Sequence, residues 1–528
     1  MSKNARTLSQ QLDSEATLFE KIQSAIDLDN KTTNSTLAEI AEEIKLSDSF
    51  VKGSSSFYDF LNAEEKAHDT LVCQGTACMV NGSSSEVLKQ YKKCGKAMCV
   101  GHCYQGGALL KRDSDGRLSS FCHTQQGLEQ KDIPVYGLAE SNILTSKPAS
   151  IEALYQTALE NQNIPLELEH SKLRGRGGGG FLFAFKCEQM AKTTSKDKYI
   201  VCNADEGDPG AFSDRYLLEE QPHKVMAGMY AAGIAAGANT GYLYIRYEYP
   251  EAITAVEHAI KAFNALDDSI SKHFSFRIVP GAGSYVCGEE TALLNSIEGL
   301  RPEVRTRPPY PATYGLWGRP TIVSNVETFA NIPWILQNGG DAFAAIGTQE
   351  SKGTKLISLD SQFNKPGLYE VDFGYAFEQL IYTDAGGFNV DVKALQVGGP
   401  LGSIVATESI DKFTLDFESF QTQGFALGHA GIIAIPSTFP MLKFMHHIFA
   451  YMADESCGKC TPCRLGTAKA EILINDAITK KSLMDGVFLE ELLSLLETTS
   501  LCALGGGIPL PIRNIINQFE EELTPYFI

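Results

Sequence analysis

The stretch FRIVPGAGSYVCGEETALLNSIEG, residues 276–299, decides the fold class of this chain. A short apolar run predicts a strand, a glycine-rich loop follows it, and apolar residues at helical spacing come next. Two earlier stretches repeat this order: KYIVCNADEG (198–207) is a strand entering an acidic loop, and TGYLYIRYEYP (240–250) precedes the helix EAITAVEHAIKAFNAL. Such alternation predicts an α/β domain with a parallel sheet, which we place at residues 140–350.

The segments around this domain predict three others. A chain of 528 residues is too long for one core. Residues 351–437 contain short strands and glycine-rich turns, which predict a small β-rich domain. Residues 438–528 predict helices, and residues 1–130 predict helices followed by a cysteine-bearing domain. The predicted fold class is therefore multidomain α/β and α+β.

Composition excludes several classes of protein. The apolar content of 43% and charged content of 21% are ordinary for a globular chain. The net charge of −19 argues against nucleic acid as a partner, because phosphate binding needs a basic surface. The first residues lack the apolar core of a signal peptide, and no apolar run approaches the roughly 18 residues that span a bilayer. We therefore expect a cytoplasmic chain with no direct membrane insertion.

The strongest chemical motif is ESCGKCTPCRLGT, residues 455–467. It spaces Cys457, Cys460 and Cys463 three positions apart, and Cys502 follows 39 positions later. Three such thiolates can bind three irons of a cube and leave the fourth iron to a distant cysteine. Zinc sites usually take their ligands from two separate pairs, and no fitting histidine follows here. The pattern favours a [4Fe–4S] cluster, with zinc and inert buried thiols as the alternatives.

A second cysteine group contains two pairs about twenty residues apart: Cys73, Cys78, Cys99 and Cys103. This spacing fits zinc and [2Fe–2S] equally well. The neighbouring Cys94 and Cys122 are interpreted as small buried side chains. In a cytosolic chain, clustered cysteines favour metal binding over disulfides.

Two loops and a helix start carry the other candidate residues. The glycines of LRGRGGGGF (173–181) could let the backbone approach a phosphate or flat ring, but the strand usual before such a loop is missing, so a flexible turn stays possible. Lys186 is a phosphate partner or an ordinary surface lysine. In CNADEGDPGAFSDR (202–215), Asn203, Asp205, Glu206 and Asp208 could bind ribityl or ribose hydroxyls, or could form a solvated loop or a cation site. Glu289 and Glu290 begin a predicted helix, where the macrodipole alone accounts for acids.

These motifs suit one redox chain. NADH releases two electrons as a hydride, iron–sulfur clusters accept them singly, and a flavin converts between the two modes. Hydride transfer to a flavin depends on stacking and orientation more than on a protein acid or base. No residue is therefore predicted to be catalytic by itself, and Asp208 and Glu289 are the nearest candidates.

The motifs together resemble a known family. Residues from about 140 to the C-terminus resemble the flavin-carrying, NADH-oxidising subunit of respiratory complex I, a module shared with NAD-reducing hydrogenases and NAD-dependent formate dehydrogenases. The matching stretches are GRGGGGF, CNADEGDPGAF-DR, YIRYEYP, GAGSYVCGEETALL-S-EG, RPPYPA-YGLWGRPT, NVET, KPGLYEV, GGPLG, ESCGKCTPCR-GT and SLCALG. Residues 30–125 resemble the thioredoxin-like [2Fe–2S] subunit, through LAEIAEEIKL, SSSFYDFL and both cysteine pairs. The two are fused in one chain here, which resembles some diaphorase subunits of hydrogenases and formate dehydrogenases.

The resemblance implies four domains and a set of site residues. The domains are thioredoxin-like with [2Fe–2S] (1–130), Rossmann-like with FMN and NAD(H) (140–350), β-grasp-like, or soluble-ligand-binding-like (351–437), and a helical bundle with [4Fe–4S] (438–528). The implied FMN residues are Gly175, Arg176, Gly177, Gly178, Lys186, Asn203, Asp205, Glu206, Tyr285, Gly288, Glu289, Glu290 and Asn325. The implied NAD residues are Phe181, Asp208, Arg307 and Tyr310. The implied [4Fe–4S] ligands are Cys457, Cys460, Cys463 and Cys502, and the [2Fe–2S] ligands are Cys73, Cys78, Cys99 and Cys103.

The chain departs from the family pattern at several of these positions. The departures are Leu182, Phe183 and Ala184 for Pro-Thr-Gly, Asp208 for Glu, Arg307 for Lys, Tyr310 for Phe, and Ser324 for Asn. An acid near the adenine-side ribose repels a 2′-phosphate and so favours NAD over NADP. The shorter Asp208 repels that phosphate from further away.

The implied function is an NADH:acceptor oxidoreductase, or diaphorase, subunit of a soluble multisubunit complex. Its partners would be a small iron–sulfur subunit and a catalytic hydrogenase or formate dehydrogenase subunit. The alternatives are the NADH-dehydrogenase module of a complex I-type enzyme, and a zinc-binding scaffold without catalysis.

Overall fold

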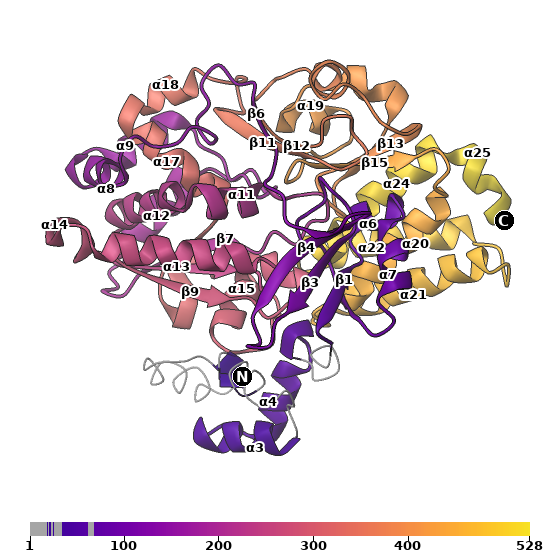
Figure 1. Cartoon of the computed structure of the whole chain (residues 1–528), viewed down its shortest axis with the longest axis horizontal. Coiled ribbons are helices and arrows are strands. Elements are labelled where there is room, and N and C mark those ends of the chain that lie inside the picture. Colours follow the sequence, from indigo (N-terminus) through magenta and orange to yellow (C-terminus); the bar gives the residue numbers. More distant parts are fainter. Residues whose placement is uncertain (1–17, 20, 23–24, 26–33, 62–67) are drawn as a thin grey trace.

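The computed structural model describes residues 18–19, 21–22, 25, 34–61 and 68–528 (Figure 1). Of the helices predicted in residues 1–65, it describes α3 (Asn34–Glu43) and α4 (Asp48–Ser55), with a short turn η1 (Asp59–Leu61). The described residues 18–19, 21–22 and 25 are also helical, and the rest of residues 1–33 and residues 62–65 lie outside the described residues. Three sheets and a C-terminal group of helices make up the described part of the chain.

The first sheet carries the N-terminal cysteines and has the order β2-β1-β3-β4-β5. Its strands are β1 (Thr70–Cys73), β2 (Gly95–Ala97), β3 (Ala108–Arg112), β4 (Leu118–Thr124) and β5 (Gly127–Glu129), and its helices are α6 (Thr76–Val80) and α7 (Ser83–Gln90). Strand β2 pairs parallel with β1, and the other pairs are antiparallel. In Figure 1 these purple strands lie between the magenta α/β part and the yellow C-terminal helices.

The second sheet is entirely parallel, with the order β10-β7-β8-β9. Its strands are β7 (Tyr199–Ala204), β8 (Thr240–Ile245), β9 (Ser275–Pro280) and β10 (Thr321–Asn325). The sequence predicts the first three, and β10 is too short to show a clear period. A parallel sheet needs both faces covered, and helices supply this cover. The helices and turns of this part are α8 (Ile151–Glu160), α9 (Ile164–Ser171), α10 (Phe183–Ala191), α11 (Ser213–Glu220), α12 (Pro222–Ala236), α13 (Pro250–Asn264), α14 (Asp268–Ser271), α15 (Glu290–Ile297), α16 (Pro311–Tyr314), α17 (Val326–Asn338) and α18 (Gly340–Ala344), with η2 (Tyr285–Gly288) and η3 (Leu316–Gly318). Among them α10, α12, α13, α16 and α17 contact the strands directly.

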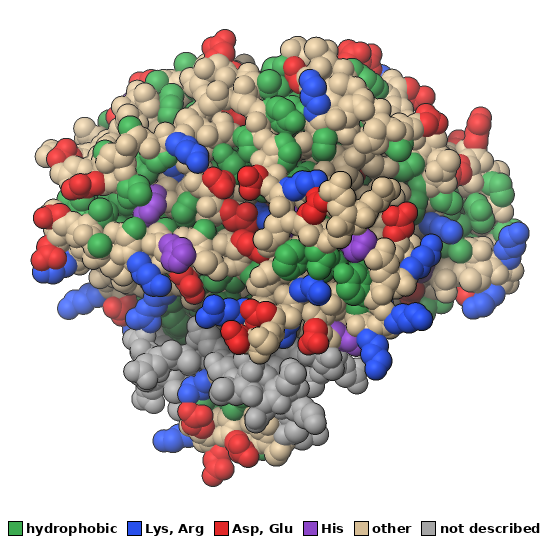
Figure 2. All heavy atoms as spheres, viewed as in Figure 1, with side chains coloured by type: hydrophobic (Ala, Val, Ile, Leu, Met, Phe, Trp, Pro, Cys, Tyr) green, Lys and Arg blue, Asp and Glu red, His purple; other side chains and the backbone are tan. Residues whose placement is uncertain are grey.

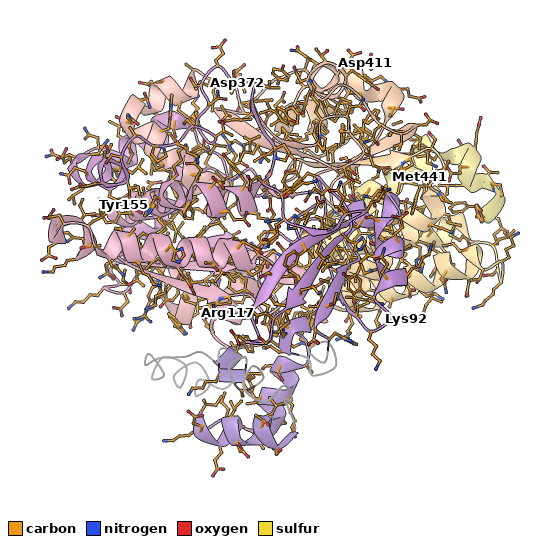
Figure 3. All side chains as sticks on the ribbon, in the orientation of Figure 1. Lys92, Arg117, Tyr155, Asp372, Asp411 and Met441 are labelled. Atoms are coloured by element: carbon orange, nitrogen blue, oxygen red, sulfur yellow. The ribbon has the colours of Figure 1, made fainter. Side chains whose placement is uncertain are left out.

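Aromatic rings fix the helical layer over this sheet. Tyr155 of α8, which Figure 3 labels, is fully buried. Its ring centroid lies 4.9 Å from that of Phe263 on α13 and 5.7 Å from that of Tyr230 on α12. Tilted and edge-on ring contacts of this kind stabilise a core beyond the area that they bury.

The third sheet is mixed, with the order β14-β13-β15-β11-β12-β6. Its strands are β6 (Val135–Gly137), β11 (Thr354–Leu359), β12 (Gly367–Asp372), β13 (Val392–Val397), β14 (Ser403–Ala406) and β15 (Gly431–Pro436), with η4 (Gln379–Asp384), η5 (Thr407–Lys412) and α19 (Phe417–Thr422). Strand β6 precedes the 140–350 segment and pairs parallel with β12. A three-residue edge strand has no alternation of its own, so tertiary pairing alone reveals it.

The C-terminal segment is helical. Its elements are α20 (Met441–Asp454), α21 (Thr461–Ile478), α22 (Gly486–Thr499), α23 (Ala503–Gly506), α24 (Pro509–Gln518), α25 (Glu520–Leu523) and η6 (Thr524–Tyr526). On the face shown in Figure 2, acidic, basic and apolar side chains are interspersed. Within the described residues, every helix falls short of the length and apolar character that a membrane crossing requires.

A buried ion pair joins the second and third sheets. Glu327 of α17 binds Lys355 of β11, and both side chains are fully buried. The other Glu327 oxygen accepts the Leu356 backbone N–H at 3.3 Å, and Arg176 Nε lies 3.9 Å from it. Removing one partner of such a pair leaves an uncompensated buried charge. The pair therefore fixes how the two sheets sit against each other.

Replacing Glu327 with Gln should lower the free energy of unfolding by about 3–5 kcal/mol, because Lys355 then stays charged and buried without its partner. Urea denaturation followed by circular dichroism measures this change. Glu188→Gln is the matched control, since Glu188 pairs with Lys192 on the surface at 2.5 Å and should contribute little. Equal effects of the two substitutions would show that the buried pair does not hold the sheets together.

Candidate functional site

A cleft of about 370 Å³ lies where the second sheet, the third sheet and the C-terminal helices meet. Its size falls in the range of small-molecule and cofactor sites. It is lined by Gly177, Gly178, Gly179, Asn203, Asp205, Glu206, Gly207, Asp208, Asp214, Tyr285, Val286, Gly288, Glu289, Asn325, Gly398, Leu401, Gly402, Ala426, Gly428, His429, Ala503 and Leu504.

The parallel sheet explains why many predicted residues come together. Asn203 and Asn325 are register partners at the carboxyl ends of β7 and β10. The acidic loop follows β7, and η2 with Tyr285 follows β9, so each contributes from the same edge of the sheet. Open α/β sheets bind ligands at this edge. The predicted residues that line the cleft are Gly177, Gly178, Asn203, Asp205, Glu206, Asp208, Tyr285, Gly288, Glu289 and Asn325.

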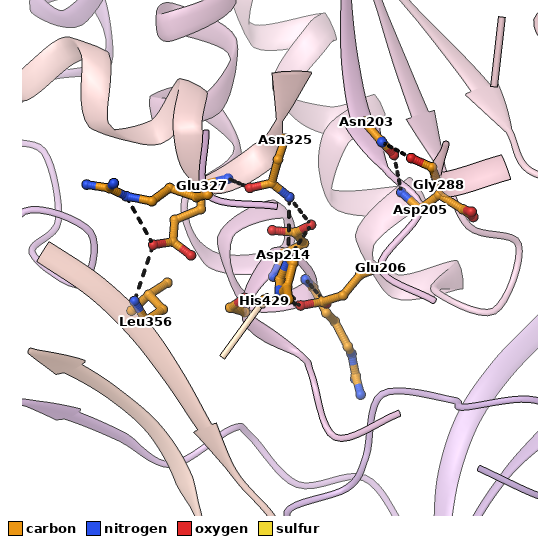
Figure 4. Close-up of polar contacts among 12 residues, drawn as sticks. Asn203, Asp205, Glu206, Asp214, Gly288, Asn325, Glu327, Leu356 and His429 are labelled. Atoms are coloured by element: carbon orange, nitrogen blue, oxygen red, sulfur yellow. Dashed lines mark hydrogen bonds and ion pairs between the residues drawn. The ribbon is translucent and has the colours of Figure 1, made fainter. Parts of the chain in front are cut away.

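Hydrogen bonds hold these side chains in place (Figure 4). Asn203 Nδ2 donates to the Gly288 carbonyl at 2.8 Å, and this bond ties the end of β7 to η2. Tyr285 Oη donates to Asp208 Oδ1 at 2.8 Å. Asn325 caps α17 by accepting the Glu327 N–H at 2.9 Å. The site is therefore organised before any ligand enters.

The glycine-rich loop forms one wall of the cleft. It runs from α9 into α10, so a helix precedes it, in agreement with the missing strand signal. A Cβ at Gly177 would lie 3.1 Å from the Asn325 Cβ. Gly178 has φ +102°, a conformation that a residue with a side chain adopts only with strain. The loop backbone therefore packs closely against the acidic edge of the sheet.

Seven predicted residues lie outside this lining: Gly175, Arg176, Phe181, Lys186, Glu290, Arg307 and Tyr310. The Arg176 side chain is buried against the third sheet, where it donates to the Lys352 carbonyl at 2.5 Å and stacks 4.6 Å from the Phe373 ring centroid. Its guanidinium is thus engaged in structure. Gly175 donates its N–H to the Phe181 carbonyl at 2.8 Å and closes the loop.

Charged and aromatic side chains gather around α10, α15 and α16. Lys186 Nζ donates to the Val323 carbonyl at 2.9 Å and lies 3.4 Å from Glu290, which also binds Arg307 at 2.8 Å. Phe181 and Tyr310 expose 52% and 59% of their surface, so each side chain offers exposed surface to a flat ligand.

Sequence reasoning missed the contribution of the third sheet. His429 and the loops at Gly398–Gly402 and Ala426–Gly428 complete the cleft from that sheet. Asp214 of α11, which also lines the cleft, was not predicted either. GGPLG appeared among the matching stretches without an assigned role. The signal that could have found His429 is ALGHAG, a histidine flanked by small residues directly before a buried strand.

Four polar atoms of the cleft make no hydrogen bond to any described residue: Asp205 Oδ2, Asp214 Oδ1, Glu289 Oε1 and His429 Nδ1. Buried polar atoms normally have partners, so this group fits a ligand rich in hydroxyl and N–H groups. Burial raises the pKa of Asp205 and Asp208, and it raises the pKa of Glu206 to about 7, with the neighbouring Asp214 adding to the effect. Asp205, Glu206 and Asp208, which form the floor of the cleft, are thus held in a poorly solvated environment.

A second, small cavity adjoins the cleft and is ringed by Cys457, Cys460, Cys463 and Cys502. Cys460 and Cys502 precede α21 and α23, where free backbone N–H groups favour a negatively charged ligand set. Sulfur ligands converging on one space suit a thiolate-bound cluster. Val286 and Leu504 line both this cavity and the cleft, so the two sites share a wall.

The N-terminal cysteines form a third group. Cys73 ends β1, Cys78 lies in α6, and Cys99 and Cys103 place their sulfur atoms 3.5 Å apart. The hydrogen bond with Cys99 and burial raise the pKa of the Cys103 thiol, and the nearby Cys78 and Cys73 add to the effect. Cys94 lies aside, 3.1 Å from the Tyr91 carbonyl.

Comparisons with known proteins match this arrangement along most of the chain. Three family models match: a Nuo51 FMN-binding domain at residues 168–334, an NADH-ubiquinone oxidoreductase-F iron-sulfur binding region at 443–526, and a thioredoxin-like [2Fe-2S] ferredoxin at 5–105.

Similar proteins include subunits of multisubunit redox enzymes. The NADP-reducing hydrogenase subunit HndC of Solidesulfovibrio fructosivorans is 40% identical over 73% of this chain and 77% of its own. A subunit of the NADH-quinone oxidoreductase of Rhizobium meliloti is 38% identical, over 68% of this chain and 87% of its own. The NAD-reducing hydrogenase HoxS subunit alpha of Cupriavidus necator is 30% identical over 92% of this chain and 88% of its own. A chain of an NAD+-reducing [NiFe]-hydrogenase in the air-oxidized state superposes with a TM-score of 0.85 at 26% identity, covering 97% of this chain and 93% of that one.

Replacing Cys103 with Ser should lower the iron content by about two atoms per chain, because a [2Fe–2S] cluster does not survive loss of a thiolate ligand. Cys94→Ser is the matched control and should leave iron unchanged. Iron, zinc and labile sulfide are measured together on the purified chain. Zinc at the wild-type site, or equal iron loss in both variants, would contradict the ligand assignment.

Proposed function

The chain belongs to the family of NADH-oxidising flavin and iron–sulfur subunits, and we propose that it is the diaphorase subunit of an NAD-reducing hydrogenase-type complex. It is an oxidoreductase acting on NADH, and its cofactors are FMN, NAD(H), one [4Fe–4S] and one [2Fe–2S] cluster. The observation that carries the proposal is the wall that the cleft shares with the cysteine-ringed cavity. It brings a two-electron site and a one-electron site within one layer of side chains.

Bound FMN would accept a hydride and deliver its electrons singly, which is the conversion that the two sites require. The chain's own residues bind and orient it. The glycine loop at Gly175–Gly178 brings its backbone close to the phosphate side, with Lys186 behind it. Asp205 Oδ2 and Glu289 Oε1, which make no hydrogen bond to a described residue, would accept from ribityl and ring donors. Asn203, Glu206, Tyr285, Gly288, Glu290, Asn325 and Arg176 complete the proposed FMN site, Arg176 through its backbone.

The nicotinamide nucleotide would bind on the open side of the same cleft. Phe181 and Tyr310 offer exposed rings for the adenine. Asp208 faces the cleft and is oriented by Tyr285. Arg307, paired with Glu290, can turn to the nucleotide phosphates. Asp208 and Glu289 position reactants and do not take part in covalent steps.

Cys457, Cys460, Cys463 and Cys502 would hold a [4Fe–4S] cluster, which supplies one-electron chemistry, and Cys73, Cys78, Cys99 and Cys103 would hold a [2Fe–2S] cluster. We assign the segments 1–130, 140–350, 351–437 and 438–528 as thioredoxin-like, Rossmann-like, β-grasp-like and helical-bundle domains. A small iron–sulfur subunit and a catalytic hydrogenase subunit are the proposed partners. The clustered cysteines favour a cytoplasmic location.

The N-terminal region favours a hydrogenase-type host over a complex I-type module. The Rhizobium meliloti relative aligns with 68% of this chain, whereas the HoxS alpha subunit aligns with 92%. The hydrogenase chain covers 97% of the structure. A formate dehydrogenase host shares the same diaphorase chemistry and is the second candidate.

Anaerobic NADH should bleach the flavin absorbance of the purified chain and produce a reduced-cubane signal in electron paramagnetic resonance. In Cys463→Ala that signal should disappear while bleaching persists, because the flavin cleft keeps its lining. Cys187→Ala, at a buried cysteine of α10 outside both cavities, is the control and should retain both signals. Wild-type protein loaded with iron and FMN that shows no bleaching would refute the proposed function.

Replacing Asp208 with Asn should raise the ratio of kcat/KM for NADPH to that for NADH by about tenfold, because one carboxylate no longer repels the 2′-phosphate. Steady-state rates with an artificial acceptor measure the ratio. Asp341→Asn changes an exposed acid outside the cleft and should leave the ratio unchanged. An unchanged ratio in Asp208→Asn would remove this residue from the nucleotide site.

A further inference from the structure

His429 is a buried side chain that lines the cleft. It lies in the turn between Gly428 and β15 and is 6% exposed. The next residue, Ala430, has φ +66°, which a residue with a side chain seldom adopts. Tertiary contacts therefore hold this turn, and with it the imidazole, against the local backbone preference.

Two acids from the 140–350 segment hold the imidazole (Figure 4). Nε2 lies 3.5 Å from Asp214 Oδ2, and Nδ1 lies 3.7 Å from Glu206 Oε1. Glu206 Oε1 already accepts from Ser213 Oγ and the Asp214 N–H, each at 3.1 Å. His429 Nδ1 makes no hydrogen bond with any described residue. One N–H of the ring is thus left for a ligand.

The charge balance of the cleft makes this imidazole important. Five acids line the cleft: Asp205, Glu206, Asp208, Asp214 and Glu289. Among the described residues of that lining, His429 is the one side chain able to carry a positive charge. FMN brings a phosphate, and its ring gains negative charge on reduction. An anion in a poorly solvated, acidic cleft needs a cationic partner.

His429 carries that charge at neutral pH. Burial by itself would lower the pKa of His429, but Asp214 and Glu206 outweigh burial and raise the pKa to about 9. Lys355 of β11 acts in the opposite direction on the same ring. The groups facing the imidazole are therefore Asp214 from α11, Glu206 from the loop after β7, Lys355 from β11 and the neutral Asn325 at the start of α17.

We propose that His429, clamped by Asp214 and Glu206, is a cationic positioning residue that donates a charged hydrogen bond to the anionic part of bound FMN. The inference rests on the proposed function, since it requires FMN in this cleft. The phosphate and the reduced ring offer the same chemistry to an imidazolium. They differ in whether the contact depends on the redox state of the cofactor.

The test compares His429→Gln with the wild-type chain, both as the full chain with its clusters. Gln keeps a hydrogen-bond donor and similar size but loses the charge. A charged hydrogen bond is worth enough that the dissociation constant of FMN should rise about ten- to a hundredfold. His170→Gln makes the same chemical change at an exposed histidine, which pairs with Asp341 at 3.5 Å, and should change nothing.

The dissociation constants of oxidised FMN, reduced FMN and riboflavin, from flavin fluorescence, distinguish the two contacts. Equal weakening of both FMN redox states with unchanged riboflavin assigns the charge to the phosphate. Greater weakening of reduced FMN, with riboflavin following, assigns it to the ring. Either result supports the inference. FMN binding within about threefold of wild type in every form overturns it while leaving the proposed function intact. A wild-type chain that binds no FMN refutes the proposed function instead.

The pH dependence gives a readout that a structural role would not move. The imidazolium is present below the pKa of about 9 and is lost above it, so wild-type FMN affinity should fall through that pH towards the His429→Gln value. Glu206, with a pKa of about 7 in the wild-type chain, titrates at lower pH, so the difference between the two curves near pH 9 reports on His429. Parallel curves across this range would exclude a charged role.

Discussion

The parallel register of β7 with β10 is the constraint on which the rest of the site depends. It sets Asn203 opposite Asn325 at the carboxyl edge of the sheet. Asn325 then begins α17, while the acidic loop begins after β7, so a helix start and a loop meet at one point. A shift of this register would separate the glycine loop from the acids that face it. Backbone hydrogen bonding between β7 and β10 thus positions the Asn203 and Asn325 side chains on one side of the cleft.

The second sheet cannot form the cleft alone. The third sheet supplies the loops at Gly398–Gly402 and Ala426–His429, and the C-terminal helices supply Ala503 and Leu504. The buried Glu327–Lys355 pair fixes the first of these contacts. The same packing places the cysteine cavity directly behind Val286 and Leu504. A cofactor in the cleft would therefore lie close to a cluster in the cysteine cavity, because Val286 and Leu504 line both spaces.

The electrostatics of the cleft follow from this assembly. Asp205, Glu206 and Asp208 follow β7 in one loop that lines the cleft, and burial raises the pKa of all three carboxyl groups. His429, in the turn before β15 of the third sheet, lies between Asp214 and Glu206 and can carry the opposite charge. The arrangement favours a ligand with many hydroxyl and N–H donors and at least one anionic group, and FMN has both.

The sequence by itself determined the fold class, the parallel sheet and the cysteine groups, because each rests on a local pattern: strand and helix periodicity, glycine loops and cysteine spacing. It also identified ten of the 22 residues that line the cleft: the acidic loop indicated Asn203 and Asp205, and the family resemblance implied Tyr285 and Asn325. The tertiary structure alone decided that Arg176 faces the third sheet, that β6 joins that sheet, and that Asp214 and His429 complete the floor. The physical reason is that these features arise from contacts between distant segments, for which neither periodicity nor spacing leaves a local trace.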